Sequence, residues 1–223
     1  FVQGNSYVGA ADTRFSCVRY GNVVGSRGSV VPLFREQAHT GQITLTDERM
    51  TRFWITLEQG VEFVLTCTER MRGGEVFVPK IPSMKLTDLA EAIAPGCRRA
   101  FIGIRPGEKL HEALLTEDEA RHARDVGDRY LIEPEHPWWN QAKVEGSALP
   151  DGFRYTSDNN SDWLTVEVQR HLLRCGPAGG DRERRPATVG GEKITQTIRD
   201  AARHMLECDI GALPVGESCT HAG

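Results

Sequence analysis

The chain has 223 residues, of which 39% are hydrophobic and 26% are charged, and its formal net charge is −4. This composition is typical of a soluble globular protein, and the slight negative charge gives no electrostatic reason to expect binding to nucleic acid or to an anionic membrane surface. No apolar run approaches the roughly eighteen residues of a membrane span, and no signal peptide precedes the first predicted strand.

The six cysteines are scattered, without a C-x-x-C pair or a cluster of histidines beside them. This spacing argues against a zinc site and against a disulfide framework. We therefore expect no metal, and a reducing cytoplasm is the expected location. The first residue is Phe1 rather than Met, so the chain is expected to lack its natural start.

The stretch over residues 14–34 organises the rest of the sequence. Phe15, Cys17 and Val18 form a short apolar run that predicts a buried strand. A loop over residues 19–28 follows, in which glycines alternate with Arg and Asn. Glycine lets the backbone approach a ligand closely, and ligands of open α/β sheets bind beyond the carboxyl ends of strands. The loop is either a ligand-binding loop or an ordinary turn, and the pattern alone leaves both open.

Strand and helix patterns then alternate along the chain. Predicted strands cover residues 42–46, 75–79, 100–104 and 128–133, and predicted helices cover residues 31–40, 57–70, 86–93 and 163–173. Pro82 and Ser83 predict a turn. Thr116 and Glu119 form a capping-box pattern, so the acidic residues there are explained by a helix start rather than by a metal site.

Two charged segments are candidates for binding an anion. Arg49 and Arg52 stand three residues apart beside Phe53 and Trp54, which fits either a surface salt-bridge pattern or a phosphate contact. Farther along, a predicted strand runs into Arg-Pro-Gly-Glu at residues 105–108, which is either a solvated turn or part of a binding site.

Taken together, these segments resemble one family. The run Arg-Tyr-Gly-Asn-Val-Val-Gly-Ser-Arg-Gly-Ser-Val at residues 19–30, the Arg-Pro-Gly-Glu-Lys segment at residues 105–109 and the Tyr-Thr-Ser segment at residues 155–157 resemble extended short-chain dehydrogenase/reductases that act on nucleotide sugars. Within them, the chain is most similar to the inverting UDP-N-acetylglucosamine 4,6-dehydratases. The implied fold class is α/β, the C-terminal part of a Rossmann-type extended short-chain dehydrogenase/reductase with a small mixed α/β substrate domain. The cofactor-binding half is expected upstream of Phe1.

The resemblance also implies which residues bind ligands. Arg52 and Arg105 would hold the diphosphate, with Arg49 as a second choice, and Glu108 would accept hydrogen bonds from ribose hydroxyls. The full substrate-binding set is Asn22, Thr44, Arg49, Arg52, Arg105 and Glu108, and the cofactor-binding set is Tyr20, Asn22 and Val23. No catalytic residue is expected in this chain. Tyr7 lacks a Lys four residues on, and His111 is interpreted as a structural histidine on a helix after the turn.

By the same resemblance, the whole enzyme uses NADP, oxidises a UDP-sugar at C4, removes water across C5 and C6 and returns hydride to C6 with inversion at C5. This places it in pseudaminic acid and polysaccharide biosynthesis, which supplies flagellin glycosylation, and the full-length family favours a homo-oligomer. The chain alone is expected to be inactive. It is also expected to be poorly soluble or oligomeric, because missing strands leave an exposed sheet edge. An epimerase of the same fold is an alternative.

The composition changes at Gly176. Residues 176–193 predict a flexible charged linker, and residues 194–223 resemble the first helix and strand of a cystathionine-β-synthase-type (CBS) domain, which are too few to bury a core. Residues 1–175 would form the substrate-binding part. Because paired domains of that type bind adenosine nucleotides, a non-catalytic nucleotide-binding or regulatory protein is a second hypothesis.

Overall fold

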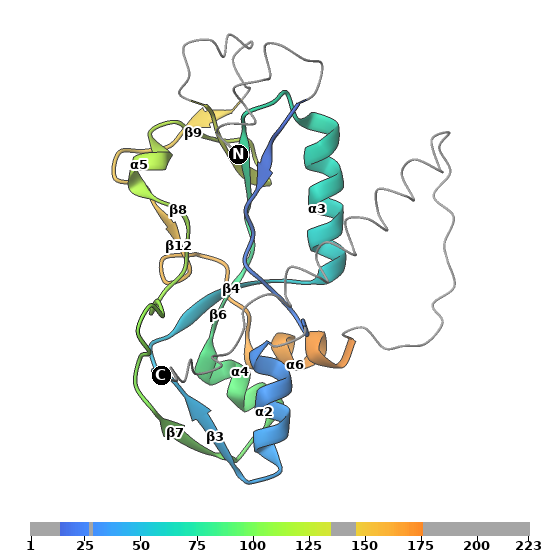
Figure 1. Ribbon diagram of the computed structural model, residues 1–223, viewed down its shortest axis with the longest axis vertical. Helices are drawn as coiled ribbons and strands as arrows, with labels where there is room; N and C mark the ends of the chain where they lie inside the picture. The colour runs from blue at the N-terminus through green and yellow to red at the C-terminus, as the bar shows by residue number, and fades with distance from the viewer. Residues whose placement is uncertain (1–13, 27–28, 135–145, 176–223) are drawn as a thin grey trace, which may run out of the picture.

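The computed structural model describes residues 14–26, 29–134 and 146–175. Within them the molecule is elongated, with a sheet and a long helix at one end and shorter helices beside a small sheet at the other (Figure 1). Tyr7, the predicted linker and the CBS-like segment lie outside the described residues.

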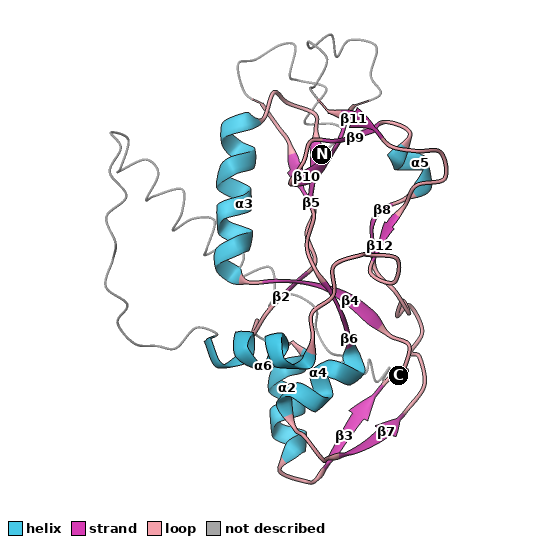
Figure 2. Ribbon diagram, turned by 180° about the vertical axis from the view of Figure 1, so that it is seen from behind, coloured by secondary structure: helices cyan, strands magenta, loops and turns pink. Residues whose placement is uncertain are grey.

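The end of the molecule drawn at the top of Figure 1, which we call the upper region, is built on a five-stranded sheet in the order β1-β5-β10-β9-β11. We call the opposite end the lower region. Its strands are β1 (Cys17–Val18), β5 (Val76–Pro79), β10 (Arg129–Ile132), β9 (Ala123–Asp125) and β11 (Ser147–Ala148). The β1–β5 pair is parallel and the other pairs are antiparallel. Helix α3 (Leu57–Arg70) lies beside this sheet (Figure 2), and Cys67 of the helix is buried in one apolar cluster with Phe77 and Leu131 of the strands.

The lower region combines α2 (Val30–Ala38), α4 (Leu86–Ile93) and α6 (Val166–Cys175) with the parallel pair β3 (Gln42–Leu45) and β7 (Arg98–Phe101). Val31 and Phe34 are three residues apart on α2, one helical turn, so both point into the same core. Arg35 of α2 donates to the Leu173 carbonyl of α6 at 3.1 Å and ties these two helices together.

Between these regions runs a three-stranded sheet in the order β2-β4-β6, formed by β2 (Asn22–Val23), β4 (Thr51–Ile55) and β6 (Ser83–Lys85). β2 pairs with β4 in parallel, and β6 pairs with β4 antiparallel. A separate pair joins β8 (Ala113–Leu115) to β12 (Tyr155–Thr156), and the short helix α5 (Glu117–Ala120) follows β8.

Strand β4 is shared by the two apolar cores. Successive side chains of a strand point to opposite faces, so Phe53 and Ile55 lie in the core that faces the upper region, whereas Trp54 lies in the core of the lower helices. All three are at most 3% exposed. The middle of β4, at Phe53, is therefore packed on both faces, and the polar residues around it are positioned by both cores.

Most predicted elements are confirmed, but the first strand is half-buried and excludes Phe15, which is 41% exposed, and the last helix begins at Val166 instead of Trp163. The observed α3 has the predicted bounds, its Thr56 and Gln59 form a capping box, and the predicted capping box of Thr116 and Glu119 is present at α5. The predicted turn at residues 82–83 is wrong at Ser83, which begins β6 because it pairs with Phe53. The predicted strand over residues 100–104 lies instead at Arg98–Phe101, where it pairs with β3.

Candidate functional site

The predicted glycine-rich loop begins where β1 ends, and its backbone passes very close to β4. A Cβ atom added to Gly21 would lie 2.5 Å from the Phe53 Cβ atom and 2.8 Å from the Phe53 carbonyl oxygen. Any larger residue would therefore push the two segments apart. The close approach places Asn22, the exposed first residue of β2, in register with Trp54 of β4.

The side chains of Asn22 and Glu112 form hydrogen bonds with each other and with the backbone of Phe53. The Asn22 amide nitrogen donates to the Phe53 carbonyl at 3.2 Å and to the two Glu112 carboxylate oxygens at 2.8 and 3.0 Å. The Phe53 backbone N–H donates to Glu112 Oε2 at 2.9 Å. Arg52 Nε lies 3.7 Å from Glu112 Oε1. We call Asn22, Arg52, Phe53 and Glu112 the Glu112 cluster.

A layer of hydroxyl groups fixes the backbone of Glu112. The Glu112 N–H donates to Ser157 Oγ at 2.9 Å, and the Ser157 N–H donates to the Glu112 carbonyl at 2.8 Å. The Ser157 hydroxyl is fully buried and lies 2.7 Å from Thr51 Oγ1, which also lies 2.8 Å from His111 Nδ1. His111 thus has a partner within the protein, and it lies in the segment before β8 and not on the predicted helix.

Arg52 uses most of its donors within the protein. Nη1 donates to the Thr51 carbonyl at 2.7 Å and to the Leu110 carbonyl at 3.1 Å, and Nη2 contacts Met50 Sδ at 3.2 Å. Its side chain is 15% exposed. In this conformation the guanidinium group joins β4 to the segment that carries Leu110 and Glu112, and part of Nη2 remains for another partner.

The second polar group is the turn at residues 105–108, which we call the Arg105 turn. The Glu108 N–H donates to the Arg105 carbonyl at 3.0 Å, and Gly107 has a φ of +82°. Proline at the second position and glycine with positive φ at the third are the requirements of a type II turn. The Glu108 carboxylate folds back, accepting from the Arg105 N–H at 3.3 Å and from Thr46 Oγ1 at 3.4 Å.

The guanidinium of Arg105 is exposed and makes no hydrogen bond or ion pair with any described residue. No such bond joins Arg105 to Arg52 or Asn22 within the described ranges either. The Arg105 turn and the Glu112 cluster nevertheless share one segment: Glu108 stands four residues before Glu112, which limits their Cα separation to about 14 Å. Leu110 between them accepts hydrogen bonds from Thr51 and Arg52.

Two other predicted binding residues have protein partners. Arg49 donates from Nε and Nη2 to the carboxylate of Asp47 at 3.0 and 2.8 Å, and this side-chain hydrogen bonding lowers the pKa of Asp47 to about 2. Thr44 exchanges two hydrogen bonds with the Gln37 amide, at 2.7 and 3.0 Å, which attaches β3 to α2. Both contacts are local supports of the lower region.

Arg19, at the start of the loop, connects the end of β1 to α5. Its two terminal nitrogens donate to the Glu119 carboxylate at 3.0 and 2.9 Å, and Nη1 also donates to the Leu114 carbonyl at 3.0 Å. This pairing lowers the pKa of Glu119 to about 2. Arg19 therefore anchors the loop and does not present its charge to a ligand.

Among the described residues, only the three predicted ones at the start of the loop are candidates for contact with a nicotinamide cofactor. Val23 is 7% exposed and belongs to the upper core, and Tyr20 packs against the same cluster. Of the three predicted cofactor-binding residues, Asn22 is exposed, Tyr20 is half-buried and Val23 is buried. A G-x-G-x-x-G pattern for a pyrophosphate does not occur in the sequence.

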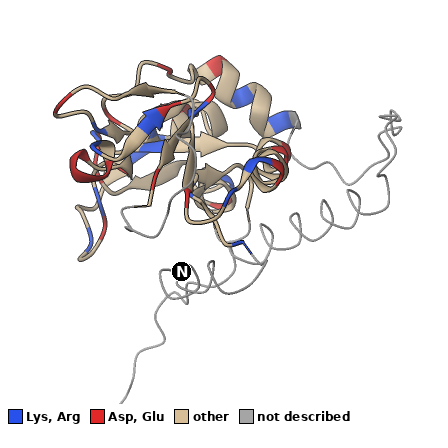
Figure 3. Cartoon of the chain, turned by 90° about the horizontal axis from the view of Figure 1, so that it is seen from above, with Lys and Arg blue, Asp and Glu red and all other residues tan. Residues whose placement is uncertain are grey.

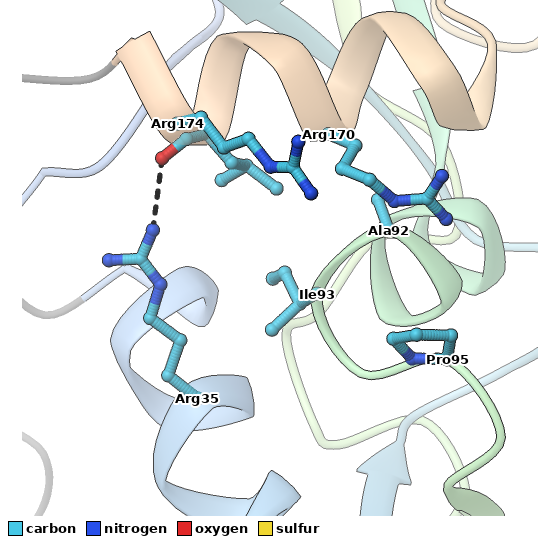
Figure 4. Close-up of a pocket in the computed structure, with 7 residues that line it drawn as sticks. Arg35, Ala92, Ile93, Pro95, Arg170 and Arg174 are labelled. Atoms are coloured by element: carbon cyan, nitrogen blue, oxygen red, sulfur yellow. Dashed lines mark hydrogen bonds between the residues drawn. The ribbon is translucent and has the colours of Figure 1, made fainter.

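Two hollows lie away from these groups. The first, of about 250 Å³, lies between α2, α4 and α6 and is lined by Arg35, Ala92, Ile93, Pro95, Arg170, Leu173 and Arg174 (Figure 4). Arg35 and Arg174 stand in the last turns of their helices, where cations complement the partial negative charge of the helix end. We interpret it as a contact region between helices.

The second hollow, of about 410 Å³, is lined by Phe77 and Leu131 together with charged residues at the end of α3. Its Arg129 is 2% exposed and pairs with Asp128 at 2.6 Å, and its buried Glu75 accepts from Ser16 at 2.8 Å. Figure 3, in which the ribbon is coloured by residue type, shows Lys and Arg positions interspersed with Asp and Glu positions. Recognition of an anionic ligand therefore depends on particular arginines and not on a broad basic face.

Sequence reasoning did not identify Glu112 as part of a site. Its partner Asn22 is 90 residues away, so no local spacing joins them. The one feature of the sequence that could have indicated Glu112 is its position four residues after Glu108, on the segment that also carries Arg105.

Comparison with known proteins gives consistent results. Two inverting UDP-N-acetylglucosamine 4,6-dehydratases from Campylobacter jejuni strains are each 49% identical, over 175 and 183 residues, which are 74% and 78% of this chain and 52% and 55% of the relatives. A UDP-glucose 4-epimerase from Rickettsia canadensis is 40% identical over 172 residues, or 73% of this chain and 50% of the relative. The chain thus spans about half the length of the curated relatives it matches.

A solved structure of Pen from Bacillus thuringiensis matches 78% of this chain and 52% of its own length, with a TM-score of 0.65 and 34% identity. The predicted fold class is confirmed: the chain is a mixed α/β protein with parallel strand pairs, consistent with part of a Rossmann-like extended short-chain dehydrogenase/reductase. A family model described as a polysaccharide biosynthesis protein matches residues 1–134, more than half of the 223 residues. The chain therefore belongs to this polysaccharide biosynthesis family.

Proposed function

We propose that this chain carries the sugar-nucleotide-binding part of an NADP-dependent, inverting UDP-N-acetylglucosamine 4,6-dehydratase. The observation that carries the proposal is the Arg105 turn, an exposed guanidinium without a partner among the described residues, held beside a carboxylate by a rigid turn. The similarity to two enzymes of that name supports this choice of substrate.

The proposed roles follow from the donors that each residue has left. Arg105 has its whole guanidinium fork for two phosphate oxygens, which suits a diphosphate. Arg52, whose side chain is largely buried, would contribute positive charge to the diphosphate site and could donate to it through the remaining N–H of Nη2. Glu108 is an acceptor only, and its carboxylate suits the two neighbouring hydroxyls of a ribose. Thr44 and Arg49 would act indirectly, by holding β3 and the segment before β4.

NADP, when bound, would supply the hydride chemistry. The residues of this chain would bind the remote UDP group, and that binding energy would hold the sugar in place for reaction. Tyr20, Asn22 and Val23 would meet the cofactor only at its nicotinamide end and through backbone groups, which leaves the Asn22 side chain for the substrate. The catalytic residues are proposed to lie upstream of Phe1.

The proposal is tested by calorimetry on the 223-residue chain with UDP, UDP-N-acetylglucosamine and AMP. UDP binding that weakens by about ten- to a hundredfold in Arg105→Ala supports it, since this is the range expected for lost charge-assisted hydrogen bonds. Binding of AMP that requires residues 194–223 would instead support the regulatory hypothesis. Failure to bind either uridine nucleotide would contradict the proposed function.

A UDP-glucose 4-epimerase is the second candidate, because relatives with that name are about 40% identical. Both candidates bind a UDP-sugar, so the nucleotide does not separate them. Product analysis does: with its own upstream half restored, a dehydratase would convert UDP-N-acetylglucosamine to a 4-keto-6-deoxy sugar, whereas an epimerase would change only the C4 configuration.

The broader setting belongs to the same proposal. Residues 1–175 would form the substrate-binding part, residues 176–193 a linker and residues 194–223 a partial CBS-like segment. The full protein would act in the cytoplasm as a homo-oligomer, in the pseudaminic acid route. Among the described residues, no helix has both the length and the apolar character needed to cross a bilayer.

A further inference from the structure

The orientation of the Asn22 amide is determined by its partners. Its nitrogen faces the Phe53 carbonyl and both oxygens of Glu112, at 2.8 to 3.2 Å. All three partners are acceptors, so the group that faces them must be the NH₂ group. The carbonyl oxygen of Asn22 makes no hydrogen bond within the described part of the chain, and the residue is exposed.

Glu112 cannot readily adapt to the opposite orientation. Its carboxylate also accepts from the Phe53 N–H, and its backbone exchanges two hydrogen bonds with the buried Ser157. Arg52 lies 3.7 Å away on the same side. If the Asn22 amide turned over, its carbonyl oxygen would face a carboxylate and a backbone carbonyl. That change exchanges charge-assisted hydrogen bonds for repulsion between acceptors.

We propose that Glu112 is a positioning residue that holds the Asn22 NH₂ group inward, so that Asn22 presents its carbonyl oxygen to the ligand. The group that Asn22 recognises is then a hydrogen-bond donor, a hydroxyl of the sugar nucleotide. Phosphate oxygens accept hydrogen bonds, so they are left to the arginines. The identity of the ligand rests on the proposed function, whereas the orientation is a property of the chain without ligand.

The first test is hydrogen exchange of the Asn22 side-chain NH₂ protons, followed by NMR in the ligand-free chain. Glu112→Gln keeps the shape but leaves one acceptor oxygen for both Asn22 and Phe53. We expect exchange to accelerate by about tenfold, the factor for loss of one charge-assisted hydrogen bond. Glu36→Gln, an exposed carboxylate on α2, is the matched control and should change nothing. Unchanged exchange in a folded Glu112→Gln variant would overturn the role of Glu112.

The second test needs no Glu112 variant. In the unaltered chain saturated with UDP-N-acetylglucosamine, the Asn22 NH₂ protons should stay as protected as in the free chain. If instead they became the contact to phosphate, they would leave Glu112, and a change in their NMR chemical shifts would report the new partner. Either this change of partner or loss of protection on binding would therefore contradict the proposed orientation, even if Glu112→Gln did not fold.

A polarity exchange tests the recognised group. Asn22→Asp alone places two carboxylates together, and affinity for UDP-N-acetylglucosamine should fall about tenfold or more. Combined with Glu112→Gln, the glutamine amide can donate to the aspartate, which still presents an oxygen to the ligand, so affinity should recover by about threefold or more from that of Asn22→Asp. The recovery stays partial because the Phe53 carbonyl has lost its donor. No recovery in a folded double variant would contradict a donor group on the ligand.

The outcomes separate the two proposals. Absence of any UDP-N-acetylglucosamine binding by the unaltered chain would contradict the proposed function. It would also contradict the proposal that Asn22 recognises a hydroxyl of the sugar nucleotide. Exchange that depends on Glu112 would still establish its positioning role.

Discussion

The Glu112 cluster and the Arg105 turn lie on one segment but are built differently. Glu112 accepts from Asn22 and from the Phe53 N–H, and Arg52 spends its donors on backbone carbonyls. The Arg105 guanidinium, by contrast, is exposed and has no partner among the described residues. The comparison separates two tasks: the cluster joins strands and fixes orientation, and the turn keeps its charge available for a ligand.

The largest expected effect concerns the close approach that forms the cluster. Gly21→Ala would place a Cβ atom 2.5 Å from the Phe53 Cβ atom, and Phe53 is fully buried, so neither segment can yield. We expect the free energy of unfolding to fall by about 3 kcal/mol, at the upper end for overpacking. Urea denaturation measures it. Gly41→Ala is the control: it has positive φ but no atom within 4 Å, and should cost about 1 kcal/mol. Equal losses would refute the close contact.

The next prediction sets the two arginines against each other. Arg52→Met should lower the free energy of unfolding by about 2 kcal/mol, because the carbonyls of Thr51 and Leu110 lose a donor in a partly buried place. Arg105→Met should change it by less than about 0.5 kcal/mol, as for an exposed residue without partners. Thermal or urea unfolding of both variants checks this. A larger loss of stability for Arg105→Met than for Arg52→Met would contradict the view that Arg52 supports the fold and Arg105 is free for a ligand.

A smaller effect is expected from the geometry of the turn. Gly107 has a φ of +82° and no neighbouring atom within 4 Å of an added Cβ, so Gly107→Ala meets only backbone strain. We expect a loss of about 1 kcal/mol in stability. UDP should also bind more weakly, because the strained turn no longer holds Arg105 and Glu108 together. Unaltered UDP affinity in this variant would show that the type II turn is not needed for binding.

The smallest effect is a dependence on pH. Arg19 lowers the pKa of Glu119 from its ordinary value of 4.5 to about 2. The unfolded chain then binds more protons than the folded one, so this pair stabilises the fold above about pH 4.5 and the contribution is lost as pH falls towards 2. Glu119→Gln should therefore flatten the loss of stability between these pH values. Acid unfolding of both proteins measures the slopes, and identical slopes would contradict the pairing.

Sequence reasoning succeeded where local chemistry sets the structure. Thr116 and Glu119 form the predicted capping box of α5, through contacts three residues apart that a pattern can reveal. Apolar spacing likewise predicted α2 and α4. The Arg105 turn was also readable, because proline and glycine occupy the positions that a type II turn requires.

The short strands and the Glu112 cluster depend on distant partners instead. Ser83 begins a strand only because it pairs with Phe53, and Asn22 does so because it pairs with Trp54. Glu112 meets Asn22 across 90 residues of sequence. The sequence could suggest Arg52 as a phosphate ligand, but not that the Thr51 and Leu110 carbonyls already occupy one of its terminal nitrogens.

The central claim is that the Arg105 turn serves ligand binding and not stability. Its most direct test is calorimetric titration of UDP into the unaltered chain, Arg105→Met and Glu36→Gln. The account predicts that Arg105→Met loses about ten- to a hundredfold in affinity while it unfolds at the same urea concentration as the unaltered chain. Glu36→Gln, an exposed change on α2, should match the unaltered chain in both properties. Full UDP affinity in Arg105→Met would contradict the account.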